Sequence, residues 1–245
     1  MFQPASLKGE SPTPIDERIR SKYLFLYLLI ILLSFIPCSL FEYIYVFLLW
    51  NKGLYLVFFL LLPLNFFILI YILQISAILF SALFLVIINL IYTPKEGIFS
   101  RDINEKNYLY WNLRNLFKKW ALFVSASNPF PWLKNRFVLR FFGVKIGKNG
   151  MCDTCWISSE FVEIGHNVII GMGSTLLSFG IEQDRLILEK IRVGDDVVIG
   201  AKCVLMPGTT LKKGVKLSAH SYTNYNDVLE ENSIYLGHPA KLKEV

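Results

Sequence analysis

Apolar residues run almost without a break through the early part of the chain, and a six-residue pattern replaces them towards its end. From Tyr23 to Tyr92 only Glu42 and Lys52 carry a charge. The turn-forming triplet Asn51-Lys52-Gly53 divides this block into two pieces, and each reaches or exceeds the roughly 20 residues that a helix needs to cross a bilayer. The pattern predicts a transmembrane helical hairpin over residues 23–92, behind a polar leader at 1–22.

Two prolines, Pro37 and Pro63, lie inside the apolar pieces. Because proline kinks or ends a helix, we expect the spans proper at Tyr23–Phe41 and Leu64–Tyr92. Basic residues flank the block: Lys8, Arg18, Arg20 and Lys22 precede it, and Lys95, Arg101, Lys106, Arg114, Lys118 and Lys119 follow it. Since basic flanks mark the cytoplasmic side, we expect an integral protein of an inner or plasma membrane, with both termini cytoplasmic and two crossings rather than three.

Residues 93–142 form a connector in which apolar, aromatic and basic residues recur at helical spacing. Between Ile103 and Val124 the apolar positions are Leu109, Leu113, Leu116, Phe117, Trp120, Phe123 and Val124, with Arg114, Lys118 and Lys119 elsewhere. The pattern returns with Leu133, Phe137, Val138, Phe141 and Phe142 beside Lys134, Arg136 and Arg140. Such amphipathic helices lie in the membrane interface. A soluble helix packed against the next domain fits the same residues equally well.

Twelve positions spaced six residues apart begin at Ile146. They are Ile146, Cys152, Ser158, Ile164, Ile170 and Leu176, and then, after one interruption, Ile187, Val193, Ile199, Leu205, Leu211 and Leu217. Neither a 3.6-residue helix nor an alternating strand has this period. It is explained if each hexad is one short strand and one corner, with three hexads completing a coil whose first residues point inward. We expect the glycines that follow several of these positions to accommodate the corner backbone.

Composition agrees with this division of the chain. Of the 245 residues, 54% are apolar, which is too many for an ordinary soluble protein. The net charge of +6 suits anionic lipid or a phosphate-bearing substrate, and no nucleic-acid motif accompanies it. Four cysteines give no disulfide framework, which favours a reducing compartment. Cys152-x-x-Cys155 has no second pair, so we expect no metal site.

Three stretches resemble the hexapeptide-repeat acyltransferase superfamily. They are Val193-Gly-Asp-Asp-Val-Val-Ile-Gly-Ala, Leu205-Met-Pro-Gly-Thr-Thr and the closing Gly237-His-Pro-Ala-Lys241. The resemblance covers residues 143–245 and implies an all-β, left-handed parallel β-helix assembled as a homotrimer. A second resemblance rests on the apolar spans, Thr93-Pro-Lys-Glu-Gly97 and Phe141-Phe-Gly-Val-Lys-Ile-Gly147, and points to the membrane-attached C-terminal region of ε-polylysine-synthetase-like proteins.

The resemblance implies direct transfer of an acyl group from a CoA thioester to a hydroxyl or amine, with a histidine as general base between subunits. Family members often carry that histidine on a loop. Here the register breaks once, between Leu176 and Ile187, and the five extra residues predict a loop that has Phe179 near the expected place and no histidine. The candidate bases are His166, His220, Glu182 and Asp184.

The co-substrate implied is acetyl-CoA or another acyl-CoA. Small residues on adjacent coils would let its pantetheine arm lie close to the backbone, and lysines would meet its phosphates. The candidates are Gly200, Ala201, Lys202, Ala219, His238, Pro239 and Lys241.

Two functions stay open at this point. One is a membrane-anchored acyltransferase acting on a glycolipid, a polysaccharide precursor or a small polar acceptor, and the other is a non-catalytic trimeric membrane scaffold. The missing loop histidine favours the scaffold, whereas the regular coils with small residues favour the enzyme. The sequence identifies neither the acceptor nor the acyl chain.

Overall fold

A computed structural model describes residues 23–102, 104–126, 128, 137–150, 152 and 154–243. These residues form two compact units: a helical unit of 23–93 and 112–128, and a repeat unit of 94–111 and 137–243. Some expected positions lie outside the described residues, namely Lys8, Arg18, Arg20, Lys22, Leu133, Lys134 and Arg136. The division of the chain into leader, hairpin, connector and repeat domain stays a prediction.

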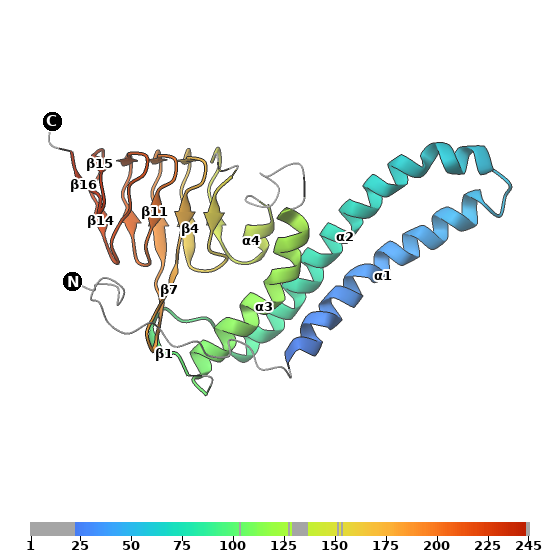
Figure 1. Ribbon diagram of the computed structural model, residues 1–245, viewed down its shortest axis with the longest axis horizontal. Helices are drawn as coiled ribbons and strands as arrows, with labels where there is room; N and C mark the ends of the chain where they lie inside the picture. Colours follow the sequence, from blue (N-terminus) through green and yellow to red (C-terminus); the bar gives the residue numbers. More distant parts are fainter. Residues whose placement is uncertain are drawn as a thin grey trace. The chain divides into compact units, whose positions relative to one another are not determined.

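The helical unit contains two long apolar helices, α1 (Leu24–Leu49) and α2 (Tyr55–Ile91), joined by a turn in which Gly53 has a φ of +73° (Figure 1). Both are long and apolar enough to cross a membrane, and little of either span is buried. α1 continues through Pro37 and α2 through Pro63, so neither proline ends its helix, and the limits of the membrane spans stay a prediction. A proline removes one backbone hydrogen bond, and a long apolar helix with a neighbouring helix beside it tolerates that loss.

A third helix, α3 (Lys106–Ala126), contributes its later residues to the helical unit. The Phe84 and Phe117 rings lie 5.6 Å apart. Gln74 Oε1 accepts a hydrogen bond from the Asn128 amide at 2.7 Å, and Gln74 Nε2 donates to the Val124 carbonyl at 3.3 Å. Buried amides that satisfy one another in this way fix the register of α3 against α2.

The basic face expected on α3 is only partly present. Arg114 and Lys118 are buried, while the apolar Phe123 is 65% exposed. The helix is buried on most sides between Trp111 and Lys118, so its charged residues cannot all face solvent. The expectation that Arg114 and Lys118 lie away from the buried apolar positions was therefore wrong.

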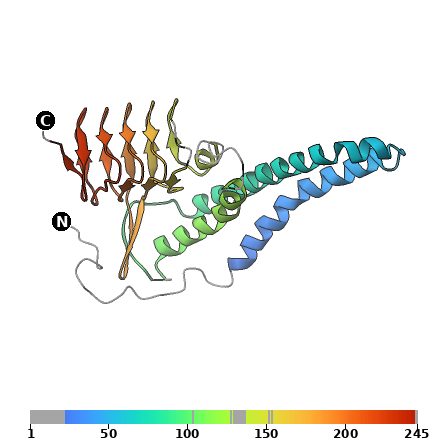
Figure 2. The same ribbon diagram turned by 45° about the horizontal axis from the view of Figure 1, so that its top comes forward.

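The repeat unit is a parallel β-helix with three faces (Figure 2). The first face contains β2 (Lys145–Ile146), β4 (Val162–Ile164), β9 (Ile191–Val193), β12 (Thr210–Leu211) and β14 (Val228–Leu229). The second contains β5 (Ile169–Ile170), β10 (Val198–Ile199), β13 (Lys216–Leu217), β15 (Ile234–Leu236) and, antiparallel at its end, β16 (Lys241–Leu242). The third contains β3 (Trp156–Ile157), β6 (Thr175–Leu176) and β11 (Val204–Leu205), and a short helix, α4 (Leu139–Phe141), precedes the first coil.

Aliphatic columns fill the interior as the hexads predict, because neighbouring coils align Ile164, Val193 and Leu211. Two predicted members were wrong. Ile157 rather than Ser158 is in register with Leu176, which replaces a polar residue in the column by an aliphatic one. Ile187 lies opposite Gly180 in an antiparallel hairpin and is not part of a coil.

At the corners, a positive φ occurs mainly at residues other than the second-place glycines, where we expected the corner backbone to need glycine. The fourth place of the hexad has positive φ: Asn149, Asn167, Gly173, Asp196, Lys202, Gly208, Gly214, His220, Asn226 and Asn232. The second-place glycines serve coil spacing instead. A Cβ on Gly171 would lie 2.5 Å from the Ala201 nitrogen, and one on Gly200 would lie 2.4 Å from the Ala219 nitrogen. Only glycine lets adjacent coils approach this closely.

The predicted loop is a β-hairpin, formed by β7 (Phe179–Glu182) and β8 (Arg185–Leu188). The register steps from Ile164 to Val193 and then from Val193 to Leu211, so the coil that carries the hairpin is eleven residues longer than the next, not five. β8 also pairs antiparallel with β1 (Gly97–Ser100) from the connector. Sequence reasoning missed this strand.

Candidate active site

Three basic residues share one corner of the prism, between the second and third faces, which we call the basic corner. Lys202, His220 and His238 occupy equivalent places in three successive coils, because β10, β13 and β15 are in register. All three side chains are exposed. Ala201 and Ala219 directly precede two of them, so small side chains lie beside the basic residues on neighbouring coils.

The other candidates for acyl-CoA contact lie around the same corner. Gly200 is stacked against the backbone of Ala219, and Pro239 follows His238 after the last coil. The His238 ring lies 5.7 Å from the Tyr222 ring. Lys241 is opposite Leu236 in the antiparallel end strand and is exposed. The structure therefore places these candidates along the basic corner and at the C-terminal end of the prism next to it.

His220 is held by its backbone and free at its ring. It has a φ of +59°, and its N–H donates to the Ala201 carbonyl at 2.9 Å. Its imidazole makes no hydrogen bond to any residue that the structure describes. An exposed imidazole with both nitrogens available can accept a proton from a bound molecule.

His166 lies at a different corner, between the first and second faces, and its ring is already engaged. The Lys148 N–H donates to His166 Nδ1 at 3.0 Å, and the His166 N–H donates to Asp195 Oδ1 at 2.6 Å. In a neutral imidazole whose Nδ1 accepts, Nε2 carries the proton. His166 in this arrangement has no nitrogen left with which to act as a base.

Glu182 and Asp184 belong to the hairpin, which leaves the prism between the third and first faces. We call this edge the hairpin corner. The Asp184 side chain is 80% exposed near the turn, with Oδ1 3.9 Å from Arg185 Nε. Glu182 is half-buried and accepts a hydrogen bond from the Tyr225 hydroxyl. The two carboxylates thus have unlike surroundings although they are two residues apart.

Tyr225 and Glu189 complete the surroundings of Glu182, and sequence reasoning missed both. Burial raises the pKa of Tyr225, and the hydrogen bond to Glu182 and the charge of Glu189 raise it further. Among the described residues, Glu182 Oε1 and Glu189 Oε2 are buried without a hydrogen-bond partner. A Cβ on Gly180 would lie 2.6 Å from the Tyr225 oxygen, so only glycine there leaves room for this phenol.

Phe179, at the place expected for a loop histidine, is part of an aromatic cluster. Its ring centroid lies 5.3 Å from that of Trp111 and 6.1 Å from that of Trp156. The cluster continues into a buried group that contains Tyr108, Trp111, Leu186 and Leu188. Phe179 therefore anchors the hairpin through apolar packing.

No group of three or more possible metal ligands occurs among the described residues. Cys152 and Cys155 are joined as a disulfide, whereas Cys38 and Cys203 are free. This disulfide joins two residues that are close together in the chain. Its three-residue separation ties a single corner and gives no framework across the repeat unit.

Comparison with known proteins adds a family match. Residues 190–222 match the family model described as "Hexapeptide repeat of succinyl-transferase". In this segment the repeat unit is similar to proteins of the hexapeptide-repeat acyltransferase superfamily. The matched segment of this hexapeptide-repeat domain runs from Lys190, at the end of the hairpin, to Tyr222, and so includes Lys202 and His220 of the basic corner.

Similar proteins include "Putative acetyltransferase YvoF" of Bacillus subtilis (strain 168), which is 29% identical over 100 residues. The match covers 39% of this chain, and the chain spans 58% of that relative's length. A hexapeptide-repeat-containing acetyltransferase, VCA0836 from Vibrio cholerae, is 22% identical, covers 41% of this chain and 61% of its own, and has a TM-score of 0.38. A galactoside acetyltransferase in complex with coenzyme A is 20% identical over 48% of this chain and 72% of its own, with a TM-score of 0.39.

Proposed function

We propose that this protein is a membrane-anchored acyltransferase, which moves an acetyl or other acyl group from a CoA thioester to a hydroxyl or amine. The observation that carries the proposal is the basic corner. Lys202, His220 and His238 align there on successive coils, with Ala201 and Ala219 beside them. The acetyltransferase name of the bacterial relative supports the same activity.

The residues of the basic corner suit an acyl-CoA. The small surfaces of Gly200, Ala201, Ala219 and Pro239 let a narrow pantetheine arm lie against the coils. Lys202, Lys241 and His238 supply donors for phosphate groups. A CoA thioester would bring to this corner a carbonyl that is open to direct attack, so no covalent nucleophile on the protein is required.

We assign the general base to His220. Its free ring takes the proton of the acceptor hydroxyl or amine as that group attacks the thioester carbonyl, and returns it to the leaving sulfur. Glu182, held by Tyr225, is the second candidate, at the other edge of the third face. His166 and Asp184 suit the role less well, because the first has its ring engaged and the second has a largely exposed carboxylate paired with Arg185.

Further parts of the proposal rest on family resemblance and on the helices. The prism is taken to be left-handed and assembled as a homotrimer, which would bring corners of neighbouring copies together. The exposed apolar surfaces of α1 and α2 support a membrane anchor, and the basic residues on either side of it support cytoplasmic termini.

A non-catalytic scaffold is the alternative, favoured by the packing of Phe179 in the aromatic cluster. Ligand-dependent stability separates the two. For the enzyme, acetyl-CoA at about 100 times its Kd should raise the unfolding free energy of the purified full-length protein by about 2.7 kcal/mol. An unchanged melting temperature at millimolar acetyl-CoA would remove the CoA site and leave the scaffold.

A further inference from the structure

The segment Glu96–Arg101, which we call the strap, holds the hairpin along its whole length. β1 within the strap pairs with β8 at four positions, from Gly97 opposite Leu188 to Ser100 opposite Arg185. At the turn of the hairpin, the Arg101 N–H donates to the Asp184 carbonyl at 2.6 Å, and Arg101 Nη1 donates to the Gln183 carbonyl at 3.0 Å. The turn beside Glu182 is therefore fixed by the strap.

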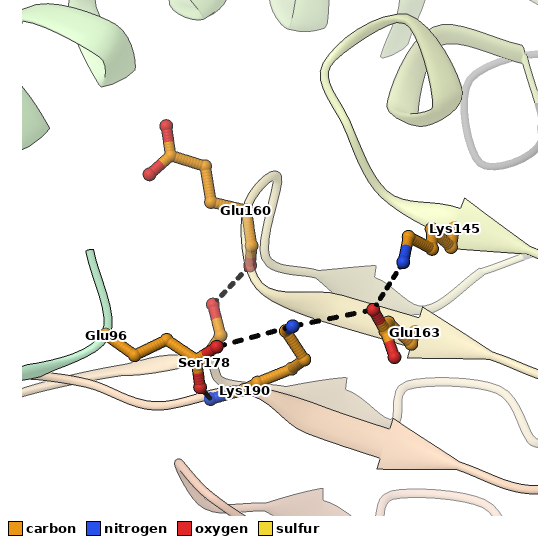
Figure 3. Close-up of polar contacts among 6 residues, drawn as sticks. All are labelled: Glu96, Lys145, Glu160, Glu163, Ser178 and Lys190. Atoms are coloured by element: carbon orange, nitrogen blue, oxygen red, sulfur yellow. Dashed lines mark hydrogen bonds and ion pairs between the residues drawn. The ribbon is translucent and has the colours of Figure 1, made fainter. Parts of the chain in front are cut away.

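The other end of the strap is fixed by charge. The Lys190 N–H donates to Glu96 Oε2 at 3.2 Å, and Lys190 Nζ lies 3.3 Å from Glu96 Oε1. Lys190 also lies 3.5 Å from Glu163 Oε1 on the first face, and Lys145 donates to the same oxygen at 2.9 Å (Figure 3). The strap is thus tied to the prism as well as to the hairpin.

Packing and hydrogen bonds also join the hairpin to the coils. Phe99 of the strap packs against the buried cluster that contains Leu186 and Leu188. At the base of the hairpin, Ser178 Oγ donates to the Glu160 carbonyl at 2.6 Å (Figure 3). With both edges engaged, the hairpin cannot move away from the strap without breaking a strand pairing and an apolar core.

The covalent chain links the strap closely to the last apolar helix. α2 ends at Ile91 and β1 begins at Gly97. A fully extended chain advances at most about 3.3–3.6 Å per residue, so this linker reaches about 20 Å. Leu90 is 82% exposed and Ile91 66% exposed at the end of α2, which extends the apolar surface of the proposed span to its last turn.

We infer that the acyl acceptor is a membrane-resident molecule, with the accepting hydroxyl or amine on its head group. The inference rests on the proposed function and narrows its acceptor to one class. β1, which follows the proposed membrane span by so short a linker, also forms the edge of the hairpin that carries Glu182, the second candidate for the general base. The covalent chain therefore keeps the start of β1 within about 20 Å of the end of the span, and so within reach of lipid head groups. Catalysis on a freely diffusing acceptor would need no such restraint.

The test uses the full-length protein in its own membranes. Membranes with and without the protein are incubated with acetyl-CoA, or in parallel with other short-chain acyl-CoAs, each radiolabelled on the acyl group, and the products are partitioned between chloroform and water. Protein-dependent label is expected in the chloroform phase. Label confined to a water-soluble product would overturn the inference and keep the acyltransferase. No protein-dependent label in either phase would overturn the proposed function, and the inference with it.

A second experiment compares two forms of the acceptor that differ only in their fatty chains. The labelled lipid is isolated, and its unlabelled form is supplied either intact in vesicles or as the water-soluble head group left after its fatty chains are removed. We expect kcat/KM to be at least tenfold higher for the intact lipid. Equal values for the two forms would contradict the inference, because the membrane would then contribute nothing to acceptor use.

Discussion

The basic corner and the hairpin corner border the same face of the prism, yet they are built in opposite ways. The basic corner repeats one backbone geometry every coil, and its side chains are exposed and independent of one another. The hairpin corner is an insertion, which residues far away in the sequence hold in place: Glu96 and Arg101 from the connector, Trp111 from α3, and Tyr225 from a later coil. The repeat by itself therefore fixes where the side chains of the basic corner lie. The inserted hairpin becomes ordered only through contacts with residues from other parts of the chain.

The largest effect should come from the basic corner. His220→Asn should lower acyl transfer by about 10²–10⁴-fold, because it removes the proton acceptor, and asparagine tolerates the positive φ of this corner. Stabilisation by acetyl-CoA should persist. His166→Asn is the matched control and should leave the rate unchanged, as measured by thiol release. Full activity in His220→Asn would move the base to Glu182 at the hairpin corner.

The second-largest effect is expected from glycines that set the spacing between coils beneath the basic corner. A Cβ on Gly200 meets the Ala219 nitrogen at 2.4 Å, whereas one on Gly150 meets only the Val168 carbonyl, at 3.6 Å. We expect Gly200→Ala to cost about 1–3 kcal/mol of unfolding free energy through overpacking, and Gly150→Ala to cost far less. Denaturant unfolding measures both, and equal losses would show that the second-place glycines do not set the spacing.

The hairpin corner should show a smaller effect, and one that depends on pH. Tyr225→Phe removes the hydrogen bond to Glu182, which should cost about 0.5–1.5 kcal/mol. Because burial raises the pKa of Tyr225 in the folded state, its contribution is present below the unfolded value near 10 and is lost as the pH rises towards the folded value. The difference in stability between the two proteins should narrow above about pH 10. A difference that stays constant from pH 8 to 11 would contradict this.

The smallest effect is expected where the prism meets the strap. The hydrogen bond from Lys145 lowers the pKa of Glu163, so the pair contributes above the unfolded value near 4.5 and its contribution is lost as the pH falls through the folded value. Lys145→Ala should cost no more than about 1 kcal/mol at pH 7, with a smaller cost at pH 3. Lys216→Ala, an exposed lysine with no ion-pair partner among the described residues, is the control. A cost equal to that of Lys216→Ala at pH 7 would mean that the pair adds no stability.

Sequence reasoning recovered most of the fold but only one side of the candidate site. The hexad period identified the aliphatic columns and the places of Lys202, His220 and His238. It misjudged Ser158 and Ile187, since a six-residue count cannot register a one-residue shift or tell where an insertion rejoins a coil. The apolar block predicted both helices, but it did not predict that they continue through Pro37 and Pro63. Whether a helix tolerates a proline depends on what surrounds the helix.

What the sequence by itself determined is everything that repeats or is local: two long apolar helices, a prism of hexads, and an edge where small and basic residues lie side by side. Only the tertiary structure decided that the break at Leu176 is a hairpin, that β1 becomes its third strand, and that Tyr225 holds Glu182. The physical reason is the range of the interactions. A periodic pattern of buried positions can be recognised from residues that are close in the sequence. Strand pairing and buried hydrogen bonds join segments that are far apart in the sequence, and no local pattern indicates which segments will meet.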